Sequence, residues 1–259
     1  KLQQLQLAGT RVTGSIVPLA ALEDLEVLWL TGTQVFGDVG ALAKLRFLRR
    51  LGLGGTFVEG DILPLSTLTE LERLGLNQTR VFGDVTSLGH LKYLERLGLG
   101  GTKVRGDVAL LASCWSLLVL DLGKTAVFGD VASFADHRKI TSIELQHTAV
   151  SGDVASLGKL KALERLDLSF TKVSGDPSPL ACLPRLEVFD LRGSEVPEGW
   201  ERIRRTASES EGYDDPRCSV SASIELLQRR NTAHTLTDAG AGSASPEVLQ
   251  RRKTAHTLA

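Results

Sequence analysis

Residues 25–47 read LEVLWLTGTQVFGDVGALAKLRF, and the same pattern returns in residues 48–70 as LRRLGLGGTFVEGDILPLSTLTE. Equivalent positions lie 23 residues apart along the chain, without insertions. A hydroxyl column contains Thr10, Thr33, Thr56, Thr79, Thr102, Thr125, Thr148, Thr171 and Ser194, and a glycine column contains Gly14, Gly37, Gly60, Gly83, Gly106, Gly129, Gly152 and Gly175. A constant period of this length is typical of a solenoid, in which equal units stack on one another in the same way.

The central Leu-x-Leu segment of each unit predicts a short strand. At Leu97 and Leu99 the two leucines are two residues apart, so alternation places both on one face and Gly98 on the other. Val104 and Val108 continue the apolar set beyond the strand. One unit alone could not cover these side chains from water, so the units must stack.

The segment Leu25-x-x-Leu28-x-Leu30-x-x-Thr33-x-Val35 resembles the strand-and-turn signature of the leucine-rich repeat family, with threonine where most members carry asparagine. The resemblance covers roughly residues 1–203, and the Gly-Asp-Val ending is similar to a plant-type Gly-x-Ile-Pro ending shortened by a residue and without its proline. It implies an α/β fold. The expected fold is a right-handed solenoid of about eight to nine repeats, with a parallel β-sheet on its concave side. The resemblance also implies that other macromolecules bind to that sheet.

Two regions are expected along the chain. Residues 1–203 form the solenoid, whose N-terminal end we expect to be truncated, because Lys1 opens directly on Leu2 without a polar capping unit. Residues 204–259 form a tail, in which the segment 227–236 returns at 249–258 and predicts two short helical repeats in a partly disordered context.

The tail also carries short basic patterns that resemble the sites of basophilic protein kinases. Two arginines precede Thr232 and Thr254 at the spacing Arg-Arg-x-Thr, and Arg205 stands three residues before Ser208. Ser208, Thr232 and Thr254 are therefore candidate phosphorylation sites. The alternative is an unmodified, solvated basic segment.

Composition excludes several classes of protein. A formal charge of -1 gives no attraction to nucleic acid, and no apolar run approaches the roughly 20 residues that a membrane span needs. The three cysteines, Cys114, Cys182 and Cys218, share no motif spacing. Extracellular relatives of this family commonly carry clustered cysteine pairs, so their absence predicts an intracellular, reducing compartment.

An aspartate follows each glycine of the glycine column, and two hypotheses could explain this aspartate column. Stacking would align like charges roughly 5 Å apart, at Asp38, Asp61, Asp84, Asp107, Asp130, Asp153 and Asp176. Each carboxylate could accept local backbone N–H bonds, or the row could bind calcium. Calcium is coordinated by six to eight oxygens, and each repeat offers one acidic group here. Hydrogen bonding of the carboxylates to the backbone is therefore favoured, and no metal or cofactor is expected.

One departure from the repeat lies on the convex side. Cys114 and His137 replace the leucine of their column, and Trp115 stands beside Cys114. Two candidate ligands do not complete a zinc site. We expect instead that Trp115 fills the space left by the smaller Cys114. The alternative is that Trp115 is exposed and marks a contact on the convex side.

The variable positions of the Leu-x-Leu strands point outward on the concave sheet, where the fold does not require a particular residue. These positions form the candidate partner-binding site. The first half combines Trp29 and an arginine row with glycines that would let a partner approach closely, and the second half is acidic. The candidate residues are Trp29, Arg50, Arg73, Arg96, Asp121, Glu144, Asp167 and Asp190. The alternative is an ordinary solvated sheet in which Arg165 pairs with a neighbouring acid, and such surface pairs contribute about 0 to 1 kcal/mol.

These observations favour a non-enzymatic scaffold that binds a protein partner on its concave face. No nucleophile, base and orienting group share a motif, and no glycine-rich phosphate loop precedes a helix. Two alternatives stay open at this point. The chain could be the regulatory repeat arm of a larger enzyme such as a kinase, or a structural subunit of a large assembly.

Overall fold

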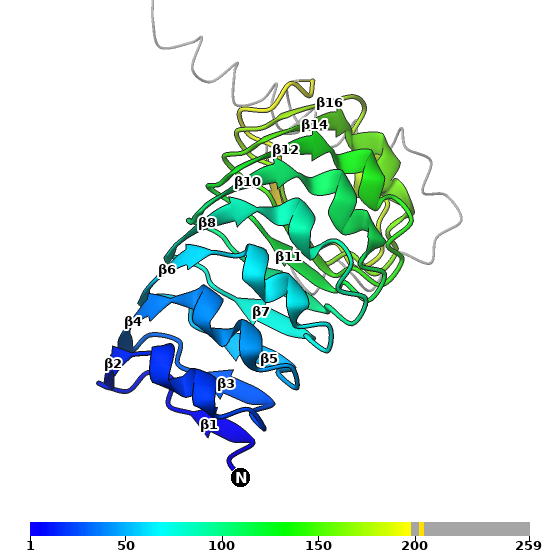
Figure 1. The fold of residues 1–259 in the computed structure, drawn as a ribbon. Helices are drawn as coiled ribbons and strands as arrows, with labels where there is room; N and C mark the ends of the chain where they lie inside the picture. Colours follow the sequence, from blue (N-terminus) through cyan, green and yellow to red (C-terminus); the bar gives the residue numbers. More distant parts are fainter. Residues whose placement is uncertain (198–201, 205–259) are drawn as a thin grey trace, which may run out of the picture. The chain divides into compact units, whose positions relative to one another are not determined.

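The computed structural model describes residues 1–197 and 202–204, in which the repeats form a stack of coils (Figure 1). Each strand of the two sheets pairs with the equivalent strand of the next coil in parallel, and the strand order follows the chain. The exception is the last strand, which returns antiparallel against its neighbour. The α/β solenoid predicted from the 23-residue period is therefore confirmed.

The ten-stranded sheet contains the Leu-x-Leu segments. Its strands are β1 (Gln4–Gln6), β3 (Val27–Trp29), β5 (Arg50–Gly52), β7 (Arg73–Gly75), β9 (Arg96–Gly98), β11 (Val119–Asp121), β13 (Ser142–Glu144), β15 (Arg165–Asp167), β17 (Val188–Asp190) and β18 (Arg202–Arg204). This is the sheet expected on the concave side.

A second, eight-stranded sheet is built from the segment around the repeat valine. Its strands are β2 (Thr13–Ser15), β4 (Gln34–Asp38), β6 (Phe57–Asp61), β8 (Arg80–Asp84), β10 (Lys103–Asp107), β12 (Ala126–Asp130), β14 (Ala149–Asp153) and β16 (Lys172–Ser174). The sequence analysis did not predict this sheet.

Short helices follow the second sheet and complete each coil. They are the 3-10 helices η1 (Val17–Ala21), η2 (Val39–Lys44), η3 (Leu63–Thr67), η4 (Val85–Leu88), η5 (Val108–Ser113), η6 (Val131–Phe134) and η7 (Val154–Lys159), and the α-helix α1 (Ser178–Ala181). Figure 1 shows these helices stacked along one side of the coils.

The core runs through the middle of the coils, as the alternation predicts. Leu97 and Leu99 are 1% and 0% exposed, and Val104 and Val108 are also buried. Each hydroxyl of the threonine column donates to a carbonyl of its own turn. Thr102 Oγ1, for example, lies 2.6 Å from the Leu99 carbonyl oxygen. The hydroxyl column thus closes the turn after each strand and does not link neighbouring coils.

The aspartate and glycine columns depend on each other. Asp107 Oδ1 accepts the Ala109 N–H at 2.8 Å, which caps the start of η5. Gly129, one coil later, has a φ of +120°, and a Cβ there would lie 2.1 Å from the same Oδ1. The carboxylate therefore occupies the space that any other residue would need. The hypothesis that the aspartates accept local backbone N–H bonds is supported. The other aspartates of the column accept the backbone N–H groups of Gly40, Leu63, Thr86, Ala132, Ala155 and Ser178.

The expectation for Trp115 is wrong. Its side chain is 66% exposed and does not fill the core beside Cys114. It stacks instead on His137, with ring centroids 5.3 Å apart and an interplanar angle of 10°. Phe134 is fully buried and makes an edge contact with the same histidine, with ring centroids 5.5 Å apart.

His137 is the poorest fit in the core. It is 3% exposed, and neither ring nitrogen has a hydrogen bond of normal geometry. Burial lowers its pKa below the ordinary 6.5, although the Cys114 backbone and Asp136 act in the opposite direction. The ring is therefore neutral in the folded state at pH 7.

Replacing Leu99 by Ala should lower the free energy of unfolding by about 2 to 5 kcal/mol, because a fully buried side chain leaves a cavity between coils. The matched change is Gly75→Ala in the outward position of β7, where a Cβ meets nothing closer than 3.9 Å. It should change stability by less than about 0.5 kcal/mol. Denaturant melts of both variants test this, and equal losses would show that the strand faces are misassigned.

Replacing His137 by Leu, the residue of the same column at Leu45, Leu68, Leu91 and Leu160, should stabilise the chain by about 1 to 3 kcal/mol at pH 7. The unfolded chain protonates His137 near pH 6.5 whereas the folded chain resists it, so wild-type stability falls as the pH drops below 6.5. The stability difference between variant and wild type should therefore widen from pH 7.5 to pH 5.5. Parallel pH profiles in urea melts would contradict this account.

Candidate functional site

The arginine row lies on the outward face of the ten-stranded sheet. Arg50, Arg73 and Arg96 are direct Cα partners across β5, β7 and β9. Strands in a sheet are about 4.8 Å apart, so three like charges stand side by side. The structure brings these predicted residues together at the predicted positions.

A hollow of about 200 Å³ lies at the N-terminal end of this row. Its lining consists of Gln6, Val27, Trp29, Arg50 and Arg73. The Trp29 ring is half-buried because it lies across Gly52, where a Cβ would come within 2.8 Å of the ring. Trp29 is thus held flat at the edge of the hollow by the glycine of the next strand.

The arginines have few acceptors of their own. Glu72 forms an ion pair with Arg49 and lies 3.7 Å from the Arg50 Nε. The Nε of Arg73 is buried and has no hydrogen-bond partner, and Arg96 is exposed without an ion pair among the described residues. A buried N–H of a charged group that lacks an acceptor is costly, so this corner of the sheet favours an incoming anionic group.

Gly52, Gly75 and Gly98 lie between the two leucines of their strands, next to the arginine row, and only part of the space above them is open. Besides Trp29 on Gly52, the Asn77 side chain lies across Gly98, where a Cβ would meet its Oδ1 at 2.7 Å. Only Gly75 leaves free space, with the nearest atom 3.9 Å from an added Cβ. A partner can therefore reach the backbone closely at one strand, between the Trp29 ring and the Asn77 amide.

Asn77 links the two halves of the face. Its Nδ2 donates to Asp121 Oδ2 at 2.9 Å, and its Oδ1 accepts the Gly100 N–H at 2.9 Å. The Asp121 carboxylate in turn lies over Gly100, 2.6 Å from the place of a Cβ. The middle of the sheet is thus covered by a polar bridge between residues 44 positions apart.

In the acidic half of the sheet, Asp121, Asp167 and Asp190 accept hydrogen bonds from other groups of the chain. Burial raises the pKa of Asp121, helped by the nearby Glu144, while hydrogen bonds from Gly123 and Asn77 oppose the rise. Asp167 accepts both the N–H and the hydroxyl of Ser169, and Asp190 holds Arg192 through two carboxylate oxygens. These acids cap their own strand ends, which makes them weaker candidates for a partner than the arginines.

The alternative of a self-neutralised surface is not met at Arg165. Arg165 is exposed and forms no ion pair within residues 1–197, so its expected pairing with Glu144, Asp167 or Asp190 does not occur. Among the described residues, Arg73, Arg96 and Arg165 therefore have no ion pair, whereas Arg50 lies near Glu72 and Arg192 pairs with Asp190.

Cys114, the candidate ligand in the same column as His137, is buried in the core. Burial raises the pKa of the Cys114 thiol to about 11, and the thiol faces the carbonyl oxygens of Leu88 and Gly89. Among the residues that the structure describes, no three metal-ligating side chains come together. The candidate phosphorylation sites Ser208, Thr232 and Thr254 lie outside the described residues.

The sequence analysis did not single out four phenylalanines that the structure shows to be exposed on the second sheet. Phe36, Phe57, Phe82 and Phe128 lie on the eight-stranded sheet and are each about half exposed. The sequence feature that could have revealed them is their position next to the repeat valine, because an apolar side chain there points outward and does not contribute to the core.

Comparison with known proteins identifies the fold. No family model and no curated protein matches the chain. Among solved structures, the plant peptide hormone receptor RGFR1 in complex with RGF2 is similar with a TM-score of 0.69 and 23% identity, over 75% of this chain and 32% of the receptor. The Arabidopsis receptor kinase HAESA in complex with the peptide hormone IDA and the co-receptor SERK1 gives 0.68 and 23%, over 75% and 34%. This chain thus spans about a third of the length of these receptor structures.

A bacterial protein is also similar over most of its length. Internalin C2 from Listeria monocytogenes gives a TM-score of 0.60 and 28% identity, over 73% of this chain and 80% of the internalin. None of the helices in residues 1–197 is long and apolar enough to span a bilayer. The two parallel sheets, the 23-residue period and these neighbours together establish that the chain has the fold of a leucine-rich-repeat solenoid.

Proposed function

We propose that this chain is a binding scaffold that holds a protein segment against the N-terminal half of the ten-stranded sheet. The contact centres on Arg73, with Trp29, Arg50 and Arg96 around it. Two observations carry the proposal: the Arg73 Nε is buried without an acceptor, and the Arg73 side chain lines a hollow beside the Trp29 ring. A carboxylate of the partner would supply that acceptor.

The size of the face favours a polypeptide over a small molecule. Nine parallel strands about 4.8 Å apart make a surface on the order of 40 Å long, and the arginine row extends over three of them. Two of the similar solved structures are receptors in complex with peptide hormones, which agrees with an extended ligand on this fold. The partner chemistry that fits best is an acidic segment with an aromatic or apolar residue to rest on Trp29.

The proposal predicts how affinity depends on the arginine row. Peptides selected from a random library on the wild-type chain should be rich in Asp and Glu. The double variant Arg73→Ala with Arg96→Ala should bind them more weakly by about 2 kcal/mol or more, because it removes two charged anchors. It should also show a shallower dependence of affinity on salt. Calorimetric titrations at two salt concentrations measure both effects.

Two matched controls define the surface. Arg165→Ala removes an exposed arginine from the acidic half of the same sheet, and Arg138→Ala removes one from the convex side. Both should leave the affinity nearly unchanged. If either control loses the peptides while the double variant keeps them, the binding surface lies elsewhere.

A further inference from the structure

The eight-stranded sheet presents a second outward face with exposed aromatic side chains. Phe82 is 48% exposed at the centre of β8, and Phe128 is 51% exposed at the equivalent position of β12. The same column holds Glu59, Arg105 and Ser151 in other coils, so the solenoid accepts polar residues there. The exposed rings are therefore not required by the fold, and the Phe82 ring lines a hollow together with the apolar Leu63 and several charged side chains.

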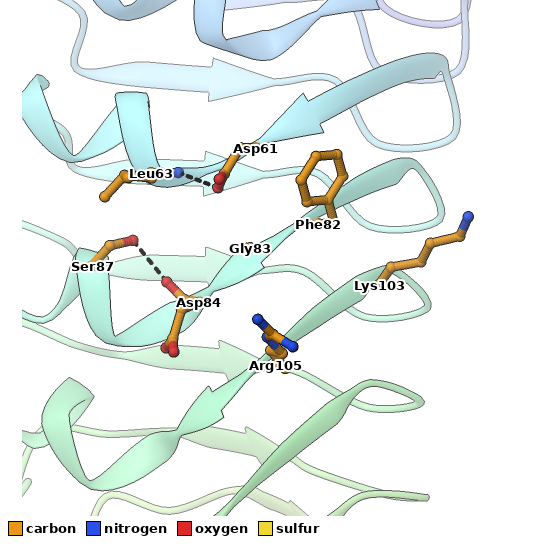
Figure 2. Close-up of a pocket in the computed structure, with 8 residues that line it drawn as sticks. All are labelled: Asp61, Leu63, Phe82, Gly83, Asp84, Ser87, Lys103 and Arg105. Atoms are coloured by element: carbon orange, nitrogen blue, oxygen red, sulfur yellow. Dashed lines mark hydrogen bonds between the residues drawn. The ribbon is translucent and has the colours of Figure 1, made fainter.

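Phe82 is flanked by opposite charges on its two sides. Its Cα partners are Asp61 on β6 and Lys103 on β10. Figure 2 shows the three side chains in a diagonal line across the strands. They line a hollow of about 450 Å³ together with Leu63, Gly83, Asp84, Ser87 and Arg105. The patch is thus acidic on one flank, aromatic in the middle and basic on the other flank.

The charges on both flanks are available to a partner. Asp61 uses Oδ1 to accept the Leu63 N–H at 2.8 Å, and no hydrogen bond from the described residues engages its Oδ2. Lys103 is exposed and makes no ion pair with described residues. Arg105 makes none either, although its Cα partner is Asp84. The coil therefore does not neutralise this patch internally.

We propose that this patch is the contact surface for a second copy of the chain. A surface that binds its own copy must be self-complementary about a two-fold axis. An axis that runs through Phe82 along β8 exchanges the two flanks, so Asp61 of each copy faces Lys103 of the other and the two Phe82 rings meet in the middle. A partner of one charge sign would match only one flank. This inference does not rest on the proposed function of the ten-stranded sheet.

Sedimentation velocity of the full chain should show a concentration-dependent dimer that weakens at high salt. Phe82→Ser should leave only monomer at the same concentrations. Phe128→Ser is the matched control, because its row holds Asp107 and Ala149 and lacks a base, and this variant should still dimerise. Circular dichroism confirms that both variants are folded. A monomeric wild type up to millimolar concentration, or a dimer that survives Phe82→Ser, overturns the proposal.

Charge exchange tests the two-fold geometry itself. Lys103→Glu alone and Asp61→Lys alone should each be monomeric, because like charges then face each other twice. An equimolar mixture of the two variants should recover the dimer, because one contact keeps Asp61 against Lys103 and the other reverses both charges. A mixture that stays monomeric, with both variants folded, contradicts the proposed axis.

Discussion

A coil of 23 residues cannot cover its own leucines from water, and the rest of the structure depends on this constraint. Each inner coil has a neighbour on either side, and the backbone repeats the same bonds from coil to coil, such as the Leu99 N–H to the Asp121 carbonyl at 2.8 Å. The repeat must then keep its inward residues, its closing threonine and its capped helix start at fixed positions. Many of the differences between coils lie at the outward positions of the two sheets and on the helical side.

The fold itself accounts for several features that resemble binding sites. The aspartate column caps helix starts, and the glycine column makes room for those carboxylates, as Gly129 does for Asp107. On the ten-stranded sheet, Asp121 and Asp167 also bond to nearby backbone groups. The arginines are different, because Arg73 and Arg96 have no such internal role. This contrast between the hydrogen-bonded acids and the two unpaired arginines is the reason that we propose the N-terminal half of this sheet as the surface toward a partner.

The sequence predicted the solenoid and the faces of the Leu-x-Leu strands, because period and alternation depend only on residue type, but it did not predict the eight-stranded sheet. It also placed the arginine row correctly, since a strict repeat converts sequence columns into spatial rows. It could not show that Trp29 lies across Gly52 or that Asn77 reaches Asp121, because these contacts depend on side-chain rotamers and on sheet register. Trp115 was misplaced because a large aromatic next to a small core residue suggests burial, whereas its ring is exposed and stacks on His137.

The most direct test of the central claim is a crystal structure of the chain with a tight-binding peptide selected from a random library. The account predicts that the peptide lies along the ten-stranded sheet and that one of its carboxylate oxygens is about 3 Å from the Arg73 Nε, with a side chain against the Trp29 ring. A peptide bound to the eight-stranded sheet, or one bound to the acidic half without touching Arg73, would contradict it.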